Sequence, residues 1–395
     1  MIILYCHNRY QLYSGEDAAF DSAKSLLERD GHQVSVFSEA SREISTYRAW
    51  EKISMASQFL YSPRSKRLLA ALVTRERPSV ALVQNVFPLL SPSVYYGLAQ
   101  AGIPVIQMVF NYRFVCANGQ FYTQGKVCER CLNGSTVNGI IRRCYRDSYL
   151  LSGLYSTALG VHRWLGTWRR CIRLFVVPDR FLRDKLVEGG LPAERMRVIA
   201  NPFDVDHYSP SFECGGYALF VGRLTRAKGI FTLLDATDRS ASVRLKIVGD
   251  GEGAEEIRRH PAVLGGKVEL LGTVYGPQLE ELLGQAAFVV VPSEWYDNLP
   301  MIVCQAFAAG KPVVASRING IPEYVRHEEN GLLFSPGDSK ELATSMERLS
   351  LDRALHRRLA EQARQTAERC FRPQRWLSEM NAVLREASQP PSCLE

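Results

Sequence analysis

Short apolar runs alternate with amphipathic stretches along the first half of the chain. Each apolar run has the length of a buried strand and is bounded by residues that favour turns or helices. The stretches between the runs carry apolar residues at helical spacing, and a glycine ends the first of them, EDAAFDSAKSLLERDG. Repeated alternation of strand and helix predicts a parallel sheet with helices on both faces. The predicted strands are IILYC, HQVSVFS, SVALVQN, PVIQMVF, CIRLFVVPD and MRVIANP.

The same pattern starts again in the second half, with the buried runs YALFVGRL, VRLKIVGDG, VELLG, AFVVVPS and PVVAS. A chain of 395 residues is too long for one ordinary core, so two α/β domains are expected. The join near NPFDVDHYSP has the Pro, Asp and Ser content of a linker. The predicted domains are an N-terminal Rossmann-like domain over 1–200, a C-terminal Rossmann-like domain over 201–372, and a helix and tail over 373–395. We expect that last helix to pack back toward the N-terminal domain.

The composition is that of a globular protein, with 46% hydrophobic and 23% charged residues. No apolar run reaches the length of a membrane-spanning helix, and MIILYCHNRY lacks the charged leader of a signal peptide. We therefore expect a cytoplasmic protein. The net charge of +7 fits an anionic ligand, an anionic membrane surface or nucleic acid.

The basic residues are concentrated between residues 140 and 174, where seven arginines face a single acid, Asp147. Trp164, Trp168 and several leucines lie among them. One interpretation is a segment that lies on anionic lipid headgroups at the inner face of the membrane. The other is an ordinary solvated helix face with both tryptophans in the core.

The stretch LFVGRLTRAKGI predicts a phosphate site. A strand ends there, Gly222 permits a tight turn, and Arg223 and Lys228 follow at the carboxyl end of the strand, where open parallel sheets bind ligands. Arginine can hold phosphate through two parallel hydrogen bonds, and lysine can act on another oxygen. The alternative is a solvated basic loop without a ligand.

Glycines at 249, 251 and 253 follow the next predicted strand. A nicotinamide-binding fold also places glycines after a strand. These glycines lie in the middle of the second domain, however, and no such fingerprint follows the first strand of the chain. We therefore keep a nicotinamide-dependent enzyme only as a remote alternative.

The stretch SEWYDNLPMIVCQAFAAGKPVVAS predicts a ligand-binding turn, then a helix, then a buried strand. Pro300 suits the first helical position, and Asp297 or Asn298 suits the cap. The free amides and the dipole at the helix start favour a phosphate there.

These motifs, together with LLGTV and EYVRHEENGLLFSPGD, resemble the group 1 glycosyltransferases of family 4, over nearly the whole chain. The resemblance implies the GT-B fold, in which two facing Rossmann-like domains hold the site in the cleft between them. It implies a retaining hexosyltransferase that moves a sugar from a nucleotide-sugar donor without a catalytic metal. The acceptor is expected to be a saccharide or lipid-linked, in bacterial surface polysaccharide synthesis. UDP is the expected nucleotide, GDP stays open, and no nucleic-acid partner is expected.

By the same resemblance, Arg223 and Lys228 hold the diphosphate, and Asp297 contacts the donor sugar. Gln305 stands at the ribose position, where relatives carry a glutamate. The full donor-binding set that we predict is Gly15, Gly222, Gly249, Asn298, Leu299, Pro300 and Gln305.

The chain departs from the family pattern at Gln305 and at Phe110, which stands where many relatives have a histidine that contacts the donor sugar. Gln305 keeps its hydrogen-bonding capacity but loses the charge, and Phe110 loses the hydrogen bond. A mechanism in which the leaving diphosphate takes the acceptor's proton needs mainly positioning and charge stabilisation from the protein. We therefore favour an active enzyme over a non-catalytic homologue that binds a nucleotide sugar or a partner protein.

Four of the ten cysteines form a C-x11-C-x2-C-x12-C pattern inside an insertion over 111–150. This spacing predicts a structural Zn²⁺ site. The intervening loops are rich in Gly, Asn and Thr, so they need a cross-link such as a bound metal to hold one conformation. An iron–sulfur cluster, free packed thiols and disulfides are the alternatives. The four predicted ligands are Cys116, Cys128, Cys131 and Cys144.

Overall fold

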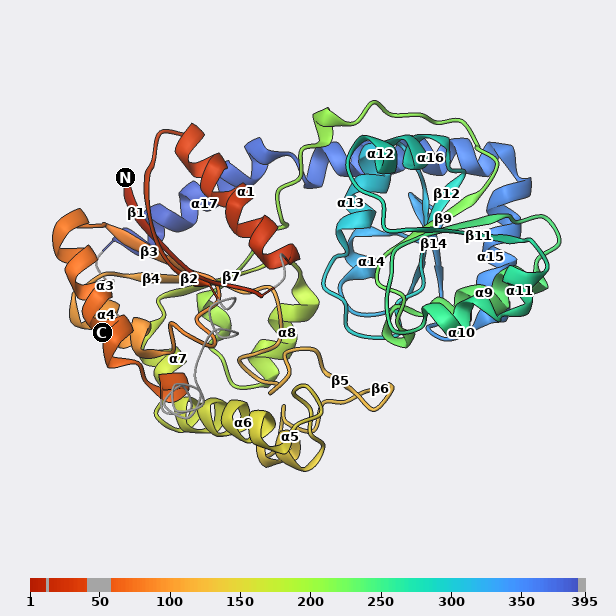
Figure 1. Ribbon diagram of the computed structural model, residues 1–395. Helices are drawn as coiled ribbons and strands as arrows, with labels where there is room; N and C mark the ends of the chain where they lie inside the picture. Colours follow the sequence, from red (N-terminus) through yellow and green to blue (C-terminus); the bar gives the residue numbers. More distant parts are fainter. Residues whose placement is uncertain (12–13, 41–57, 390–395) are drawn as a thin grey trace. The chain divides into compact units, whose positions relative to one another are not determined.

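The computed structural model describes residues 1–11, 14–40 and 58–389. These residues form two compact units (Figure 1). Unit 1 contains residues 1–119, 129–202 and 373–395, and unit 2 contains residues 120–128 and 203–372. Each unit has a parallel six-stranded sheet, so the α/β class predicted from the alternating pattern is confirmed.

Unit 1 is built on a sheet with the strand order β2-β1-β3-β4-β7-β8. Its central strands are buried along their whole length, because helices cover both faces. The strands are β1 (Ile2–Arg9), β2 (Gln33–Ala40), β3 (Val80–Val83), β4 (Val105–Met108), β7 (Leu174–Val177) and β8 (Met196–Val198).

The helices of unit 1 include one from the far end of the chain. Trp376, Met380 and Leu384 of that helix, α17, are buried in the same core cluster as Phe20 and Leu27 of the first helix, α1, so the chain's last helix completes the core of its first domain. The helices are α1 (Gly15–Arg29), α3 (Pro63–Glu76), α4 (Ser93–Gln100), α5 (Val137–Ile141), α6 (Tyr149–Trp164), α7 (Thr167–Cys171), α8 (Arg180–Glu188), η2 (Ala193–Arg195) and α17 (Pro373–Ser388).

Unit 2 repeats the architecture with the strand order β11-β10-β9-β12-β13-β14. Its strands pair in parallel throughout, and side chains of the sheet and the surrounding helices form one core cluster. The strands are β9 (Ala218–Val221), β10 (Leu245–Val248), β11 (Val268–Gly272), β12 (Phe288–Val291), β13 (Val313–Ser316) and β14 (Gly331–Phe334).

The helices of unit 2 follow its strands in alternation, as the sequence pattern predicts. Residues 120–128 add a short antiparallel hairpin of β5 (Tyr122–Thr123) and β6 (Lys126–Val127). The helices are η3 (Val205–His207), η4 (Arg226–Lys228), α9 (Ile230–Arg239), α10 (Ala254–Arg258), α11 (Pro261–Leu264), α12 (Pro277–Gln285), α13 (Met301–Ala308), α14 (Ile321–Tyr324), α15 (Ser339–Leu351) and α16 (Arg353–Cys370).

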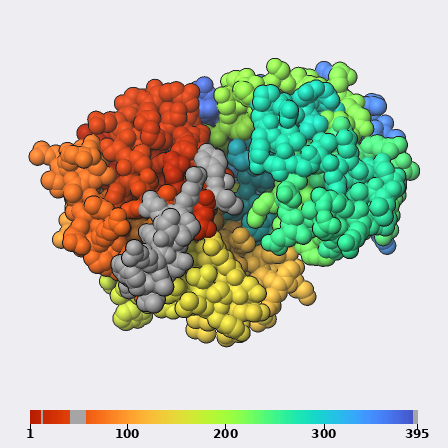
Figure 2. Space-filling model, in the orientation of Figure 1, coloured from red at the N-terminus to blue at the C-terminus, as the bar shows by residue number. Residues whose placement is uncertain are grey.

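The surface of unit 1 carries exposed apolar side chains along α5 and α6, in the part of the chain that Figure 2, coloured by residue number, draws in yellow. Leu150 and Trp164 are 73% and 84% exposed, whereas Trp168 on α7 is buried beside Tyr95. The two tryptophans therefore have different environments, and the expectation that both lie in the core is wrong for Trp164. Within the described ranges, no helix is both long enough and apolar enough to cross a membrane.

Candidate functional site

The candidate phosphate ligands of unit 2 follow β9, near the centre of the sheet. The chain runs outward from β9 to β10 and β11 and then returns to β12 on the other side of β9. The carboxyl ends of β9 and β12 therefore flank a topological switch point, where open parallel sheets bind ligands. Arg223 and Lys228 lie in the segment after β9, and Asp297 lies in the segment after β12. The fold brings these segments together, although many residues separate them in the sequence.

Glycines allow the segments after neighbouring strands to touch. Gly249 has φ +142°, and a Cβ atom there would lie 1.9 Å from the carbonyl oxygen of Gly222. A Cβ atom on Gly229, which has φ +68°, would lie 1.7 Å from the carbonyl oxygen of Pro292. Only glycine fits at these two positions. Gly222 has room for a Cβ atom, 3.4 Å from the ring of Phe220, so the contact between the two segments requires glycine at 249 and not at 222.

The two candidate cations differ in their availability. Arg223 is exposed, and its side chain forms no ion pair or hydrogen bond with any residue that the structure describes. Lys228 ends η4 and forms an ion pair with Asp297, while its Nζ lies 5.6 Å from the centre of a ring of Trp295. The charge of Arg223 is therefore open to a ligand, whereas that of Lys228 is shared with a carboxylate.

Asp297 is held by several groups of unit 2. It is 8% exposed, and Oδ2 accepts a hydrogen bond from Ser293 Oγ at 3.3 Å as well as the ion pair. Its backbone carbonyl accepts a hydrogen bond from the side chain of Asn319. Because a buried carboxylate needs partners, Lys228 and Ser293 supply the contacts that the burial of Asp297 requires.

Two of these supporting residues, Ser293 and Asn319, escaped the sequence analysis. A sequence signal existed for Asn319, which precedes a glycine after β13. Asn319 has φ +50°, a left-handed conformation that asparagine tolerates in turns. The Asn-Gly pair therefore indicates a fixed turn, but it does not indicate that the turn reaches Asp297.

The start of α13 corrects the capping prediction. Pro300 is the N-cap residue itself, the helix begins at Met301, and no side chain caps it. Asp297 does not cap because its carboxylate is taken up by Lys228 and Ser293. The Val303 amide bonds back to the carbonyl oxygen of Pro300, which leaves the amides of Met301 and Ile302 for a ligand at the carboxyl edge of the sheet. The donor-binding role of Asn298, Leu299 and Pro300 stays a prediction.

Gln305 lies on the next turn of α13. Its Nε2 donates a hydrogen bond to the hydroxyl of Tyr208 at 3.3 Å. Burial raises the pKa of Tyr208, while the bond from Gln305 lowers it, so the phenol stays protonated near neutral pH. Sequence analysis missed Tyr208, because nothing in the linker motif indicates which helix it meets. An amide and a phenol, both able to donate and accept hydrogen bonds, thus lie together on this turn; the family resemblance implies a glutamate at position 305.

In unit 1, Gly15 begins α1. The N-cap Ser14 and Asp17 form a capping box, and Asp17 also accepts a hydrogen bond from the buried His7 of β1 at 3.0 Å. Burial lowers the pKa of His7 although the Asp17 carboxylate raises it. Among the residues that the structure describes, no neighbouring group lies within 4 Å of the Cβ position of Gly15. The helix start that the family resemblance assigns to the donor is therefore held by its cap.

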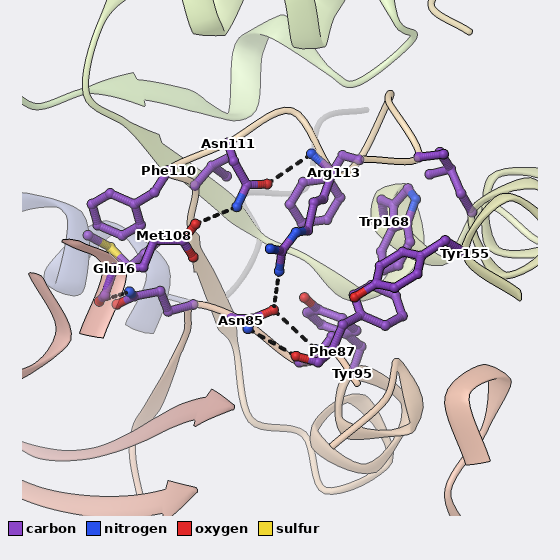
Figure 3. A pocket seen from close by; sticks show the side chains of 16 residues that line it. Glu16, Asn85, Phe87, Tyr95, Met108, Phe110, Asn111, Arg113, Tyr155 and Trp168 are labelled. Carbon is purple, nitrogen blue, oxygen red and sulfur yellow. Dashed lines mark hydrogen bonds between the residues drawn. The ribbon is translucent and has the colours of Figure 1, made fainter. Parts of the chain in front are cut away.

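A pocket lies at the switch point of unit 1, beyond the carboxyl ends of β1, β3 and β4 (Figure 3). Phe110 is part of its wall and also packs against the core of the unit. The family resemblance implies a histidine at this position, where the ring of Phe110 donates no hydrogen bond. Polar residues of the same wall include Glu16, Asn111 and Arg113.

The four cysteines of the insertion differ in their exposure. Cys116 and Cys131 are buried, whereas Cys128 and Cys144 are partly exposed. In the parts of the chain that the structure describes, no three His, Cys, Asp or Glu side chains converge to hold a metal ion. The structural zinc stays a prediction, and metal analysis of the purified protein tests it.

Unit 2 therefore combines an exposed guanidinium, an ammonium shared with a carboxylate, and uncapped helix amides at one edge of its sheet. Each of these groups attracts anionic oxygen atoms. The charge of a diphosphate matches such a set better than that of a single carboxylate ligand. The arrangement can bind a diphosphate and stabilise the charge that develops on it when it leaves.

Comparisons with known proteins agree on one class. Residues 209–366 match the family described as glycosyl transferases group 1, and residues 21–207 match glycosyltransferase family 4. Sulfoquinovosyl transferase SQD2 of Arabidopsis thaliana is 26% identical over 242 residues, covering 57% of this chain and 46% of that protein. The lipopolysaccharide core biosynthesis glycosyltransferase LpsE of Rhizobium meliloti is 32% identical over 148 residues, covering 37% of this chain and 43% of its own. The chain spans about half the length of the curated relatives it matches.

Among solved structures, Anabaena Alr3699/HepE in complex with UDP is similar, with a TM-score of 0.68 at 18% sequence identity. The match covers 98% of this chain and 100% of that one. This likeness shows the fold, and the nicotinamide alternative loses its basis because the family matches lie with transferases.

Proposed function

This chain belongs to the group 1 glycosyltransferases of family 4, which have the GT-B fold, and we propose that it transfers a hexosyl group from a nucleotide-sugar donor. The observation that carries the proposal is the pair of cations after β9, with Arg223 exposed and Lys228 held by Asp297. UDP is the first choice of nucleotide, supported by the UDP bound to HepE, and GDP is the second.

We propose a retaining transfer that needs no catalytic metal, as the family resemblance implies. Arg223 and Lys228 bind the diphosphate, and the first amides of α13 add partial positive charge. As the bond to the sugar breaks, negative charge grows on the leaving diphosphate, and these groups stabilise it. Asp297 orients Lys228 and contacts the donor sugar, Gln305 bonds to the ribose hydroxyls, and the leaving diphosphate accepts the proton of the acceptor hydroxyl.

We propose a saccharide or lipid-linked acceptor in bacterial surface polysaccharide synthesis. The relative LpsE, named for lipopolysaccharide core biosynthesis, supports this class. A nucleotide-sugar donor favours action in the cytoplasm, and a lipid-linked acceptor favours the inner membrane face.

The surface along α5 and α6 supports contact with that membrane. Seven of the large hydrophobic side chains exposed on the described residues fall between Val137 and Leu165. Leu150, Val161 and Trp164 lie on one side of α6, because their spacing follows the helical period. Exposed apolar side chains among arginines are typical of a segment that lies in the headgroup layer of an anionic bilayer. We propose that this face binds anionic lipid.

Donor turnover tests the proposed activity. Purified protein incubated with UDP- and GDP-sugars should release the free nucleoside diphosphate, and Arg223→Ala should reduce this release at least about tenfold, because a charge-assisted contact to phosphate is lost. Release equal in the two proteins would support the non-catalytic homologue. In that case, a thermal shift with the same donors would still report binding.

A further inference from the structure

The pocket of unit 1 contains the carboxylate of Glu16, and each of its two oxygen atoms accepts a hydrogen bond from the protein. Glu16 Oε1 accepts a hydrogen bond from Asn111 Nδ2 at 2.7 Å, and Oε2 accepts one from the hydroxyl of Tyr10 at 2.9 Å. Both oxygen atoms of the carboxylate are therefore engaged by the protein. A ligand gains little from donating to Glu16, since it would have to displace one of these bonds.

Arg113 lies in the same pocket and, unlike Glu16, still has unused hydrogen-bonding groups. Arg113 is half-buried, and its guanidinium donates one hydrogen bond, from Nη1 to Asn85 Oδ1 at 3.0 Å. With the residues that the structure describes it forms no ion pair; its guanidinium carbon lies 5.2 Å from the centre of the Tyr10 ring. A guanidinium carries several more N–H donors and keeps its charge at all working pH values. The Glu16 carboxylate acts on Arg113 electrostatically without contacting it, so the pocket has unused donors on a cation that no described carboxylate touches.

Arg113 is also fixed in position (Figure 3). Its partner Asn85 is 5% exposed and is anchored by hydrogen bonds to the carbonyl oxygens of Asn8 and Phe87. A Cβ atom at Gly119 would lie 2.7 Å from Arg113 Cγ. The aliphatic part of the arginine side chain therefore fits only because residue 119 is a glycine. A preorganised cation binds an anion without losing side-chain freedom at that moment.

The rest of the wall is aromatic. Phe87, Tyr155 and Trp168 line the pocket, and Trp168 is 3% exposed. The indole Nε1 of Trp168 has no hydrogen-bond partner among the described residues, which leaves a second donor unused. Ligand pockets with an apolar lining and a few fixed polar groups select a ligand with an apolar face and a matching polar group.

We propose that this pocket binds the acceptor through an anionic group, a carboxylate or phosphate carried beside an apolar face, and that Arg113 pairs with that anion. The word acceptor rests on the proposed transferase function; the pairing of an anion with Arg113 rests only on the pocket. The pocket lies at the switch point of unit 1, and all of its lining residues belong to that unit.

Paired probes test the proposal by direct binding, measured by titration calorimetry without donor. Methyl glucuronide is compared with methyl glucoside, and octyl phosphate with octanol. The first pair represents an acidic saccharide and the second a lipid phosphate. In at least one pair the anionic member should bind about tenfold more tightly than the neutral one, since charge-assisted hydrogen bonds differ from neutral ones by this order. The pair that shows the preference identifies the source of the anion.

Variants assign the preference to Arg113. Arg113→Gln should remove the preference for the anionic probe, and Arg113→Lys should retain part of it. Gly119→Ala, which displaces the arginine stem, should weaken anion binding without removing any charge. Equal binding of the anionic and neutral probes by the unaltered protein, or no binding of either anionic probe, would overturn the proposal even if Arg113→Gln failed to fold. A preference that survives in a folded Arg113→Gln would also overturn it.

UDP titration of the same protein separates this proposal from the proposed function. A preference for the anionic probes without binding of UDP or GDP would support the pairing of an anion with Arg113 and overturn the proposed transferase function. UDP binding without a preference for the anionic probes would support the donor site of the transferase and overturn the pocket assignment.

Discussion

Lys228 and Asp297 form an ion pair that joins the segment after β9 to the segment after β12. The pair holds Lys228 at the switch point of unit 2 and partly neutralises it. A diphosphate that binds there competes with Asp297 for the ammonium group. Under the proposed function, the carboxylate positions the lysine for the reaction and also weakens its attraction for the free nucleotide.

Asp297→Asn separates these two effects. Removing the carboxylate charge should tighten binding of UDP or GDP several-fold, because Lys228 then meets the phosphates without competition. Transfer should slow by at least about tenfold, because the group that contacts the sugar has lost its charge. Calorimetry and a turnover assay measure the two quantities. Glu294→Gln is the matched control, since the Glu294 carboxylate accepts a hydrogen bond from Thr232 instead, and it should leave nucleotide affinity unchanged. Weaker nucleotide binding by Asp297→Asn would contradict the competition.

Gly249→Ala tests the contact between the segments after β9 and β10. The added Cβ atom would overlap the carbonyl oxygen of Gly222, and φ +142° is unfavourable for alanine. The free energy of unfolding should fall by about 3 kcal/mol or more, as measured by urea titration. Gly284→Ala on α12 has no heavy atom within 4 Å of its Cβ position and should stabilise the helix by about 0.5–1 kcal/mol. Similar effects of the two substitutions would show that the contact is absent.

Lys311 makes the stability of unit 2 depend on pH. The side chain is fully buried, with Nζ 3.0 Å from the carbonyl oxygen of Glu213, and burial lowers its pKa from 10.5 to about 8. Between these values the unfolded chain binds more protons than the folded one, so this contribution to stability is full above pH 10.5 and is lost as the pH falls through about 8.

Lys311→Met removes this titration. The difference in free energy of unfolding between the unaltered protein and the variant should therefore rise with pH between about 8 and 10.5, by at most about 1.4 kcal/mol per pH unit. Urea titrations of both proteins at several pH values measure it. A difference that stays constant over this range would contradict the shifted pKa.

The apolar face of α6 predicts binding to anionic vesicles that weakens as salt is added. Trp164→Ser and Leu150→Ser should each reduce the fraction bound several-fold, because both side chains are exposed in the native state. Leu351→Ser is the matched control, since Leu351 is 69% exposed on unit 2 and lies away from the arginine-rich segment in the sequence. Vesicle sedimentation gives the measurement. Equal loss with all three variants, or binding that ignores salt and lipid charge, would count against a membrane surface.

The sequence predicted the sheets well because buried parallel strands leave a strong local pattern. The run YALFVGRL contains β9, and AFVVVPS contains β12. The position of the cation pair after β9 could also be predicted, because a strand end, a glycine and two basic residues follow one another within one short stretch of sequence.

Contacts between segments that lie far apart in the sequence could not be predicted from the sequence. Asp297 looked like a helix cap, and only the fold shows that Lys228 takes its carboxylate. The contacts of Tyr208 with Gln305 and of Asn319 with Asp297 likewise join segments that no local pattern connects. Trp164 and Trp168 have the same sequence character, and the position of each on its helix decides which one reaches solvent.

Nucleotide binding by Arg223→Ala, with Arg226→Ala as control, tests the central claim most directly. Both arginines lie in the same segment, but Arg226 is paired with Glu256, whereas Arg223 has no partner among the described residues. Calorimetry with UDP and with GDP should show binding by the unaltered protein and by Arg226→Ala, and affinity reduced at least about tenfold in Arg223→Ala. Equal affinities in all three proteins, or a loss confined to Arg226→Ala, would contradict the diphosphate site.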